Sequence, residues 1–331
     1  MVPTRSPPIR MSIEPTAPLP VRVTAADDES GVSCVARTFW KNGTTKRRAE
    51  AWLHVPTGQP WRNAAARTLA WATQTSYEWL SHRSFLHAEV RTDSWCRFAG
   101  HAFRSTASPP GRSARLCWQC VRERGYCKAS WLLRTVSRCA DHGLLMEACP
   151  RCSRRITWNR PAIDVCECGR YFMPDRGEDV SSAQPSAWTR WIEWQLGFAQ
   201  IRPDASDGFV PPALDALSID GASRLVEAFG LLRTAGDSSR GATVAARTAE
   251  GFATVIERGL RRLAAIDGDL DAMRALADEV HAPALERLRS IAVSEADSAC
   301  AALLLRQLQI APDAQVDLRG RYGRGQRTLF E

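Results

Sequence analysis

The chain has 331 residues, of which 44% are hydrophobic and 24% charged, as in folded globular proteins with sizeable cores. It contains no run of eighteen apolar residues, so we expect no membrane-spanning segment. The net charge of +8 is uneven, because residues 1–180 hold 27 Lys+Arg against 16 Asp+Glu, whereas residues 181–331 hold 17 against 20. The basic front half predicts an anionic partner, although a general preference for arginine explains the same excess.

Residues 1–20 contain six prolines and no apolar stretch, which favours a flexible tail over a signal peptide. Without a secretory signal, the eleven cysteines are expected to be thiols of a cytoplasmic protein. All twelve tryptophans lie at or before Trp194. An aromatic, cysteine-rich front is therefore followed by an Ala/Leu/Arg-rich region, and the pattern predicts a mainly α fold.

The N-terminal region, residues 21–108, is predicted to be helical. Apolar spacing predicts a helix over 29–41 that ends at an Asn-Gly turn and buries Val32, Val35, Ala36 and Phe39. Further helices are expected over about 62–73 and 75–83. Between them, Ala70, Gln74 and Leu80 have the spacing of a helix-turn-helix core, with Gln74 where a turn glycine is usual. An ordinary helical hairpin is the alternative, because this pattern is loose.

Two linkers rich in Ser, Pro and Gly are predicted over 102–115 and 174–187. Beyond the second, we expect a helical C-terminal domain over 187–316 and a basic flexible tail over 317–331. Its helices are predicted at about 188–196, 221–234, 242–265, 270–280 and 283–310, with breaks at Gly236, Gly268 and Pro283. The segment around Asp267 hints at a calcium loop, but it lacks the required glycine and final glutamate.

The region over 109–173 carries eight cysteine and histidine residues in closely spaced pairs. The first set has the form Cys-x2-Cys, eighteen residues, Cys-x2-His; the second has the form Cys-x2-Cys, thirteen residues, Cys-x-Cys-Gly. Two such knuckles close a tetrahedron and leave no position for water, so we predict two structural Zn²⁺ sites rather than a catalytic one. The ligands are Cys117, Cys120, Cys139 and His142 in the first site, and Cys149, Cys152, Cys166 and Cys168 in the second.

Six residues separate His142 from Cys149, so the two sites are expected to abut as one rigid tandem zinc-knuckle module with short β hairpins. Trp118, Trp131 and Trp158 are expected to fill its small core, and Cys127 to pack. The module is rich in basic residues, which suits phosphate contacts, although a solvated surface explains them nearly as well. These residues are Arg112, Arg115, Arg122, Arg124, Lys128, Arg134, Arg138, Arg151, Arg154 and Arg155.

The same segments resemble the TniQ family. The resemblance is carried by the run Leu116–Tyr126 (LCWQCVRERGY), Trp131, Cys139-Ala-Asp-His142-Gly143, Cys149-Pro-Arg-Cys152 and Cys166-Glu-Cys168-Gly169, together with Leu19-Pro20, Glu29-Ser30, Ser33, Arg37 and Asn42-Gly43. It covers about residues 19–173. The chain departs from the family at three positions without losing a ligand: Cys34 stands where Trp is usual, and Trp118 and Ala140 stand where Pro is usual.

The resemblance implies a target-selection component of a transposon. Such a protein is an adaptor that recognises target DNA, or a nucleic-acid-guided complex, and recruits an AAA-type ATPase and through it the transposase. By analogy, the helix that begins near Glu29 is expected to meet the ATPase with Glu29, Arg37 and Lys41. The sequence leaves formation of a homodimer open.

Two other functions are weighed against this adaptor. A zinc-dependent transcription regulator would use the same parts, with a palindromic operator and its own dimerisation. An enzyme acting on nucleic acid would need an open metal site, which neither ligand set offers. The chain also lacks a Walker phosphate loop, His-Glu-x-x-His and Gly-x-Ser-x-Gly, so nucleotide hydrolysis, zinc proteolysis and serine hydrolysis lack their motifs.

Overall fold

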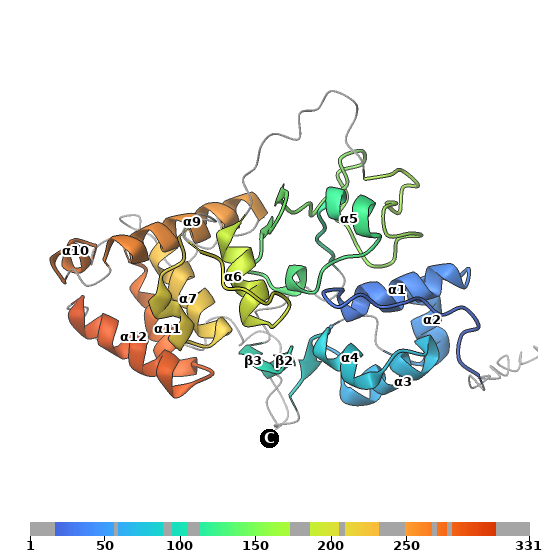
Figure 1. The fold of residues 1–331 in the computed structure, drawn as a ribbon, viewed down its shortest axis with the longest axis horizontal. Coiled ribbons are helices and arrows are strands. Elements are labelled where there is room, and N and C mark those ends of the chain that lie inside the picture. The colour runs from blue at the N-terminus through green and yellow to red at the C-terminus, as the bar shows by residue number, and fades with distance from the viewer. Residues whose placement is uncertain are drawn as a thin grey trace, which may run out of the picture.

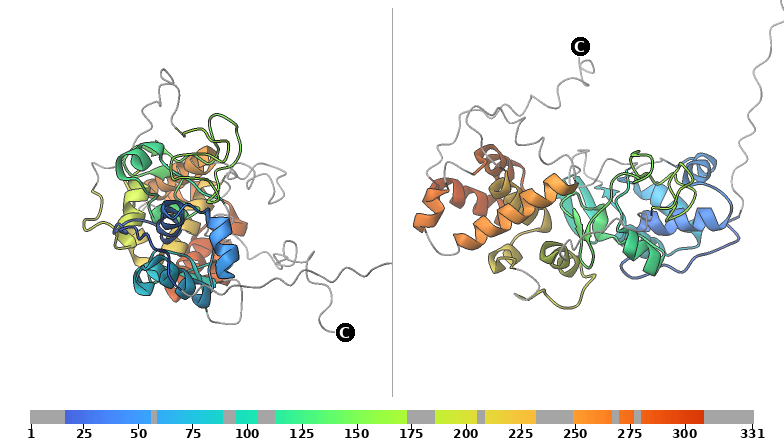
Figure 2. Two further views of the ribbon diagram at one scale, coloured as in Figure 1. Left: turned by 90° about the vertical axis from the view of Figure 1, so that its right-hand side faces the viewer. Right: turned by 90° about the horizontal axis from the view of Figure 1, so that it is seen from above.

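The computed structural model describes residues 17–55, 59–88, 95–104, 113–172, 186–204, 209–231, 249–266, 270–276 and 280–308. Most of the two predicted tails and linkers, the breaks at Gly236 and Gly268 and the segment at Asp267 lie outside these residues. Within them helices predominate and the sheets are small and antiparallel, which confirms the mainly α prediction. Figure 1 and the right-hand view of Figure 2 place the first four helices at one end and the C-terminal helices at the other.

The N-terminal end is built from α1 (Gly31–Lys41), α2 (Lys46–Leu53), α3 (Asn63–Thr73) and α4 (Tyr77–His82). Helix α1 begins where the Ser30 hydroxyl accepts a hydrogen bond from the Ser33 N–H, and its predicted apolar face is buried. Helix α2 was not predicted from the sequence. Its sequence KRRAEAWL is mostly polar, and only Ala49 and Leu53 contribute apolar side chains to the core.

The turn between α3 and α4 lies at Gln74, the position where the sequence pattern places a turn. Gln74 adopts a left-handed conformation (φ 53°), which a glycine would adopt more easily, and ends α3. Ala70 and Leu80 are buried where the two helices meet. The Leu19 N–H donates to the Ala72 carbonyl, so the predicted N-terminal tail ends before Leu19 and the chain is fixed against α3 from that point.

A three-stranded antiparallel sheet follows, in the order β1 (Leu86–His87), β2 (Trp95–Phe98) and β3 (His101–Arg104). This sheet was not predicted from the sequence, and residues 102–104, predicted as part of a linker, belong to β3. The strands are too short to show a period of two, and their stability comes from aromatic packing instead. Phe85 and Phe98 stack with ring centroids 4.7 Å apart, and Phe103 meets both of them edge-on.

The cysteine module, defined here as residues 113–172, contains α5 (Trp118–Arg124), the 3-10 helix η2 (Ser130–Leu132) and a hairpin of β4 (Arg138–Cys139) and β5 (Gly143–Leu144). The predicted β hairpin is thus present. Single β bridges join the rest of the module, including one between Leu116 and Met146 and one between Ala148 and Arg155. Regular structure is sparse, so the module depends on other interactions for its shape.

The C-terminal end contains α6 (Ala187–Gln195), η4 (Pro212–Ala216), α7 (Ile219–Gly230), α9 (Ala249–Ala265), α10 (Leu270–Ala275), α11 (Ala282–Ile291) and α12 (Glu295–Gln307). Pro283 lies in the first turn of α11, as predicted. The single helix predicted over 283–310 is wrong, because it is interrupted at 292–294. The Ser294 hydroxyl accepts from the Asp297 N–H and starts α12 as a separate helix.

Helices α7 and α9 cross at two glycines. A Cβ on Gly230 would lie 1.9 Å from the Val255 carbonyl oxygen, and one on Gly259 would lie 2.0 Å from the Val226 carbonyl oxygen. The two backbones can approach this closely only because both positions lack a side chain.

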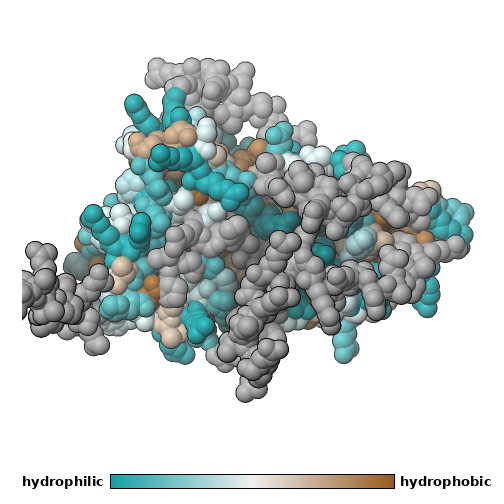
Figure 3. All heavy atoms as spheres, turned by 180° about the vertical axis from the view of Figure 1, so that it is seen from behind, coloured by the Kyte–Doolittle hydropathy of each residue, from teal (hydrophilic) through white to brown (hydrophobic). Residues whose placement is uncertain are grey.

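One hydrophobic cluster runs through all parts of the described chain. It includes Phe39 of α1, Trp131 of the cysteine module, Trp191 of α6 and Phe229 of α7. On the rear face, the described residues show brown areas that are small and separated by teal (Figure 3). No helix within the described residues is both long and apolar enough to cross a bilayer.

Candidate metal centres

The first candidate centre joins the start of α5 to the β4–β5 hairpin. Cys117 caps the N-terminus of α5, Cys120 lies in its first turn, Cys139 ends β4 and His142 lies in the following turn. Their ligand atoms all lie within 4.8 Å of one another. Cys120 Sγ is 3.1 Å from His142 Nδ1 and 3.5 Å from Cys139 Sγ, and Cys117 Sγ is 3.5 Å from His142 Nδ1.

These separations fit a tetrahedral metal site. With Zn–S bonds of about 2.3 Å, the edge between two sulfurs of a tetrahedron is about 3.8 Å. A disulfide would bring two sulfurs to about 2.05 Å, and all the cysteines of the described chain are free. The set holds three sulfurs and one nitrogen, and the described residues add no fifth ligand to it.

The second candidate centre assembles Cys149, Cys152, Cys166 and Cys168, again with all ligand atoms within 4.8 Å. Cys149 Sγ lies 4.0 Å from Cys168 Sγ, and Cys152 Sγ lies 3.7 Å from Cys166 Sγ. The tight Cys-x-Cys turn is closed by Gly169, whose φ is 80° and whose N–H donates to the Cys166 carbonyl. All eight predicted ligands are therefore brought together in the two predicted sets.

The donor chemistry of both centres calls for a cation. Hydrogen bonds with the thiols of Cys120 and Cys139 lower the pKa of Cys117 to about 3, and hydrogen bonds with Cys117 and Cys139 raise the pKa of Cys120. A backbone N–H of Arg170 lowers the pKa of Cys168 to about 7. Sulfurs this close together share their protons, and all of them become thiolates only when a positive ion lies among them. The residues present fit Zn²⁺ in this respect.

The two centres differ in their access to solvent. Cys117, Cys120 and Cys139 are buried and His142 is half-buried. In the second centre Cys168 is exposed and Cys152 is half-buried. The first centre therefore lies inside the molecule, whereas the second lies at its surface.

Groups outside the ligand sets orient the first centre. His142 Nε2 lies 3.6 Å from a carboxylate oxygen of Glu123, on the opposite side of the ring from Nδ1, which faces the sulfurs. The Asp141 N–H lies 3.5 Å from Cys139 Sγ and donates to it. Both contacts come from residues next to a ligand in the sequence or in α5, so the local chain orients its own ligands.

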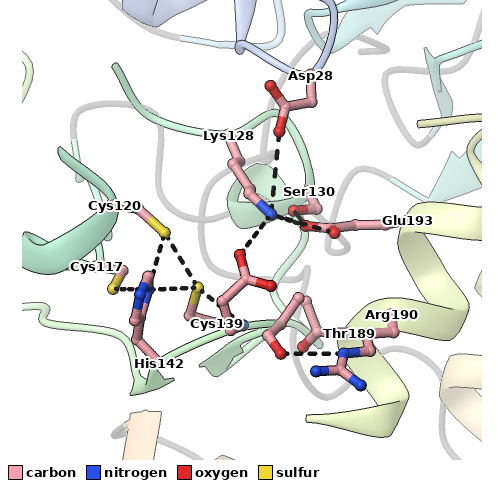
Figure 4. A network of polar contacts seen from close by, with 12 residues as sticks. Asp28, Cys117, Cys120, Lys128, Ser130, Cys139, His142, Thr189, Arg190 and Glu193 are labelled. Atoms are coloured by element: carbon pink, nitrogen blue, oxygen red, sulfur yellow. Dashed lines mark hydrogen bonds and ion pairs between the residues drawn. The ribbon is translucent and has the colours of Figure 1, made fainter. Parts of the chain in front are cut away.

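A buried lysine links this centre to the rest of the molecule (Figure 4). Lys128 Nζ lies 3.2 Å from Asp141 Oδ2, 3.4 Å from both carboxylate oxygens of Glu193 on α6, and 3.9 Å from Asp28 Oδ2. The Ser130 hydroxyl donates to Glu193 at 2.8 Å. The ammonium group of Lys128 therefore joins the segment before α1, the turn of the first metal centre and α6.

Burial and charge act in opposite directions on this lysine. Burial alone would lower the pKa of Lys128, but the carboxylates of Glu193 and Asp141 outweigh it and raise the pKa. Burial raises the pKa of Glu193, and Lys128 partly offsets this effect. The lysine thus stays charged within this network of carboxylates.

The structure separates the predicted phosphate-contact residues into distinct groups. Arg115 and Lys128 are buried, so their prediction as surface contacts is wrong. The Arg115 guanidinium donates to the carbonyls of Trp131, Leu133 and Arg134 at the end of η2. Three others form ion pairs: Arg124 with Asp28 and Asp141, Arg134 with Glu227, and Arg138 with Glu257. Arg112 lies outside the described residues.

Arg122, Arg154 and Arg155 are exposed and form no ion pair within the described part of the chain. Arg170 was not among the predicted contact residues, but it is exposed as well. The next residue, Tyr171, has a side chain that is 61% exposed. Arg151 is exposed as well and has a contact of its own. Three of these arginines, Arg154, Arg155 and Arg170, flank the second metal centre. They form the available basic surface of the module.

A second buried arginine was missed. Arg160 is buried with its guanidinium facing the rings of Trp158 at 4.9 Å, Phe172 at 5.7 Å and Trp40 of α1 at 5.8 Å. It donates to three carbonyls and to Cys127 Sγ at 3.6 Å. Burial lowers its pKa. The sequence carries no signal for this role.

The expected packing residues of the module are mostly confirmed. Cys127, Trp131 and Trp158 are buried, while Trp118 is only partly buried against the core. Neither Cys34 of α1 nor Cys300 of α12 lies near a metal centre, as their isolated positions predict.

The predicted partner surface on α1 needs correction. Glu29 is 0% exposed, accepts from the Ser33 hydroxyl at 2.8 Å and pairs with Arg37 at 2.6 Å. Burial raises its pKa, and the Arg37 charge opposes that effect. Glu29 is therefore part of the contact between α1 and its surroundings, and only Lys41 of the three predicted residues is fully exposed.

Comparison with known proteins gives no relative: no protein-family model matches the chain, and no curated protein matches it.

Proposed function

We propose that the chain is a non-enzymatic, zinc-dependent adaptor that contacts nucleic acid and selects target sites in DNA transposition. The observation that carries the nucleic-acid contact is the set of exposed arginines on a module organised by two metal centres. Arg154, Arg155 and Arg170 flank the second centre, and Arg122 lies on α5. Exposed cations that form no ion pair with the described residues are available to the regular charges of a phosphate backbone.

Zinc is the metal that suits both centres. Seven of the eight ligands are sulfur and the eighth is an imidazole nitrogen, a set that favours Zn²⁺ over harder cations. Both sets are closed, so the ions organise the chain and offer no position for a reacting water. Each would contribute on the order of 10–16 kcal/mol to folding of a segment with little regular structure.

The transposition part of the proposal rests on the resemblance to the TniQ family. That resemblance implies recruitment of an AAA-type ATPase and a transposase. The turn at Gln74 between α3 and α4 is compatible with a helix-turn-helix. Helix α4 has six residues and would present few side chains to a major groove, so the proposal assigns duplex contact to the exposed arginines of the module.

Binding of duplex DNA by the full chain tests the nucleic-acid contact. We expect affinity to fall steeply with salt, and replacement of Arg122, Arg154, Arg155 and Arg170 by Ala to reduce the slope of log affinity against log salt by about 3–4. Arg261→Ala on α9 is the matched control, because Arg261 is exposed at the other end of the molecule. An unchanged slope in the quadruple variant, with zinc content intact, would contradict the assigned surface.

A transposition assay tests the biological role. Deleting the gene is expected to abolish targeted insertion while the ATPase and transposase remain present. Insertion that continues with the same targeting would refute the adaptor. Tight binding to a palindromic operator, with no association with an ATPase, would identify the alternative, a zinc-dependent transcription regulator.

A further inference from the structure

Two exposed tryptophans lie on neighbouring helices of the N-terminal end. All twelve tryptophans fall in the described part of the chain, and the two exposed ones are Trp52 (38%) on α2 and Trp71 (43%) on α3. Burial of a tryptophan side chain is among the largest apolar gains available to a protein. Leaving two in water at one end of the molecule marks that end as a contact surface.

Each of these tryptophans is paired with an arginine one helical turn earlier. Arg48 precedes Trp52 on α2 by four residues, and Arg67 precedes Trp71 on α3 by the same spacing. Residues with this spacing lie on one face of a helix, with Cβ atoms about 5–6 Å apart. Each helix therefore carries an aromatic ring and a cation on the same face.

The charged residues that are exposed on α2 and α3 are all positive. The exposed residues of α2 and α3 are three arginines, two tryptophans and two alanines: Arg47, Arg48, Arg67, Trp52, Trp71, Ala51 and Ala64. Glu50, the one carboxylate of the two helices, is 0% exposed. This excess of cations favours an anionic partner, although Glu78 on the adjoining α4 is exposed and interacts with Arg67.

The Arg67 guanidinium is already ordered for stacking. Its Cζ lies 4.3 Å from the ring centroid of Tyr77 on α4, so its plane is held beside an aromatic ring. Both α2 and α3 pack against α1 (Figure 1), so the two pairs belong to the same helical end of the molecule.

We propose that the exposed faces of α2 and α3 bind single-stranded nucleic acid, with bases stacked on Trp52 and Trp71 and phosphates on Arg48 and Arg67. A ring and a cation at this spacing match the base and phosphate of one nucleotide. Unpaired bases are required because the faces of bases inside a duplex are covered by their neighbours. This surface lies on other elements than the arginines assigned to duplex contact and does not depend on that assignment.

Fluorescence anisotropy of a labelled oligothymidylate with the full chain tests the proposal. We expect binding by the wild type, on the order of tenfold weaker binding in Trp52→Ala and in Trp71→Ala, and partial retention in Trp71→Phe. Arg48→Ala and Arg67→Ala are expected to reduce the salt slope by about 0.7 each. Phe209→Ala, which removes an aromatic ring that is 48% exposed elsewhere, is the matched control and should bind as the wild type does.

The outcomes separate this surface from the duplex-binding module. Loss of oligothymidylate binding in the tryptophan variants, with duplex binding and zinc content unchanged, supports the proposal whatever becomes of the transposition role. Failure of the wild type to bind oligothymidylate, or equal binding by the tryptophan variants, would overturn it. Capture of poly-glutamate with the same dependence on Trp52 and Trp71 would also overturn it and identify an acidic protein as the partner.

Discussion

Three basic side chains of the cysteine module lie in its interior, although all basic residues of this region look alike in the sequence. Arg115 caps the carbonyls that end η2, Lys128 joins three carboxylates and Arg160 fills a space between aromatic rings. Residue type predicts exposure for all three. The distinction depends on partners supplied by distant segments, such as Glu193 and Trp40, and no local pattern in the sequence encodes those contacts.

Lys128→Met is expected to lower the free energy of unfolding by about 3–5 kcal/mol, because it leaves the carboxylates of Glu193 and Asp141 partly buried without their cation. Urea denaturation of the zinc-loaded protein measures this change. Lys41→Met is the matched control, since Lys41 is exposed at the end of α1, and its effect should stay within about 0.5 kcal/mol. Equal stability of the two variants would show that the buried network contributes nothing net.

Among the helices, strands and metal sites, those with a clear local sequence pattern were predicted correctly, and those without one were not. The spacing of the ligands was sufficient to identify all eight residues of the two metal centres. Each knuckle is a local structure whose two ligands converge on one point. The apolar stripe of α1 was equally clear. By contrast, α2 and the strands β1–β3 are short, and long-range packing stabilises them, so no period was visible.

Replacement of one ligand tests each metal centre separately. We expect elemental analysis to give two zinc equivalents for the wild type and about one for Cys120→Ser or Cys152→Ser, because three ligands lose most of the binding free energy. Cys34→Ser, a buried cysteine on α1, is the control and should retain both ions. A wild type with one equivalent, or a Cys34 variant that loses zinc, would contradict the assignment.

At the scale of the whole molecule, the parts predicted as separate regions share one hydrophobic cluster. The cysteine module is bonded to both ends: the Cys127 N–H donates to the Ser33 hydroxyl of α1 at 3.1 Å, Trp188 of α6 donates to the Thr135 carbonyl at 3.2 Å, and the Ala249 N–H at the start of α9 donates to Glu147 at 3.2 Å. These contacts join residues more than fifty positions apart. A sequence read by composition shows where regions change, but it does not show that their cores are continuous.

Removal of zinc is therefore expected to affect helices that hold no ligand. Chelation should accelerate amide hydrogen exchange in α6 and in the first turn of α9, because both are anchored on the cysteine module. Amides of α12, which packs on α10, α11 and α7, should keep most of their protection. Added zinc should restore the original exchange. Acceleration confined to residues 113–172 would show that the module unfolds independently.

The crossing of α7 and α9 has a mechanical consequence. Each helix inserts a glycine against a carbonyl of the other, Gly230 at Val255 and Gly259 at Val226. Sliding either helix by one residue would replace a glycine at the contact by a residue with a side chain, for which no space exists. The two helices therefore resist sliding along each other. Force applied to the C-terminal end by a bound partner would then be transmitted to the cysteine module rather than absorbed between these helices.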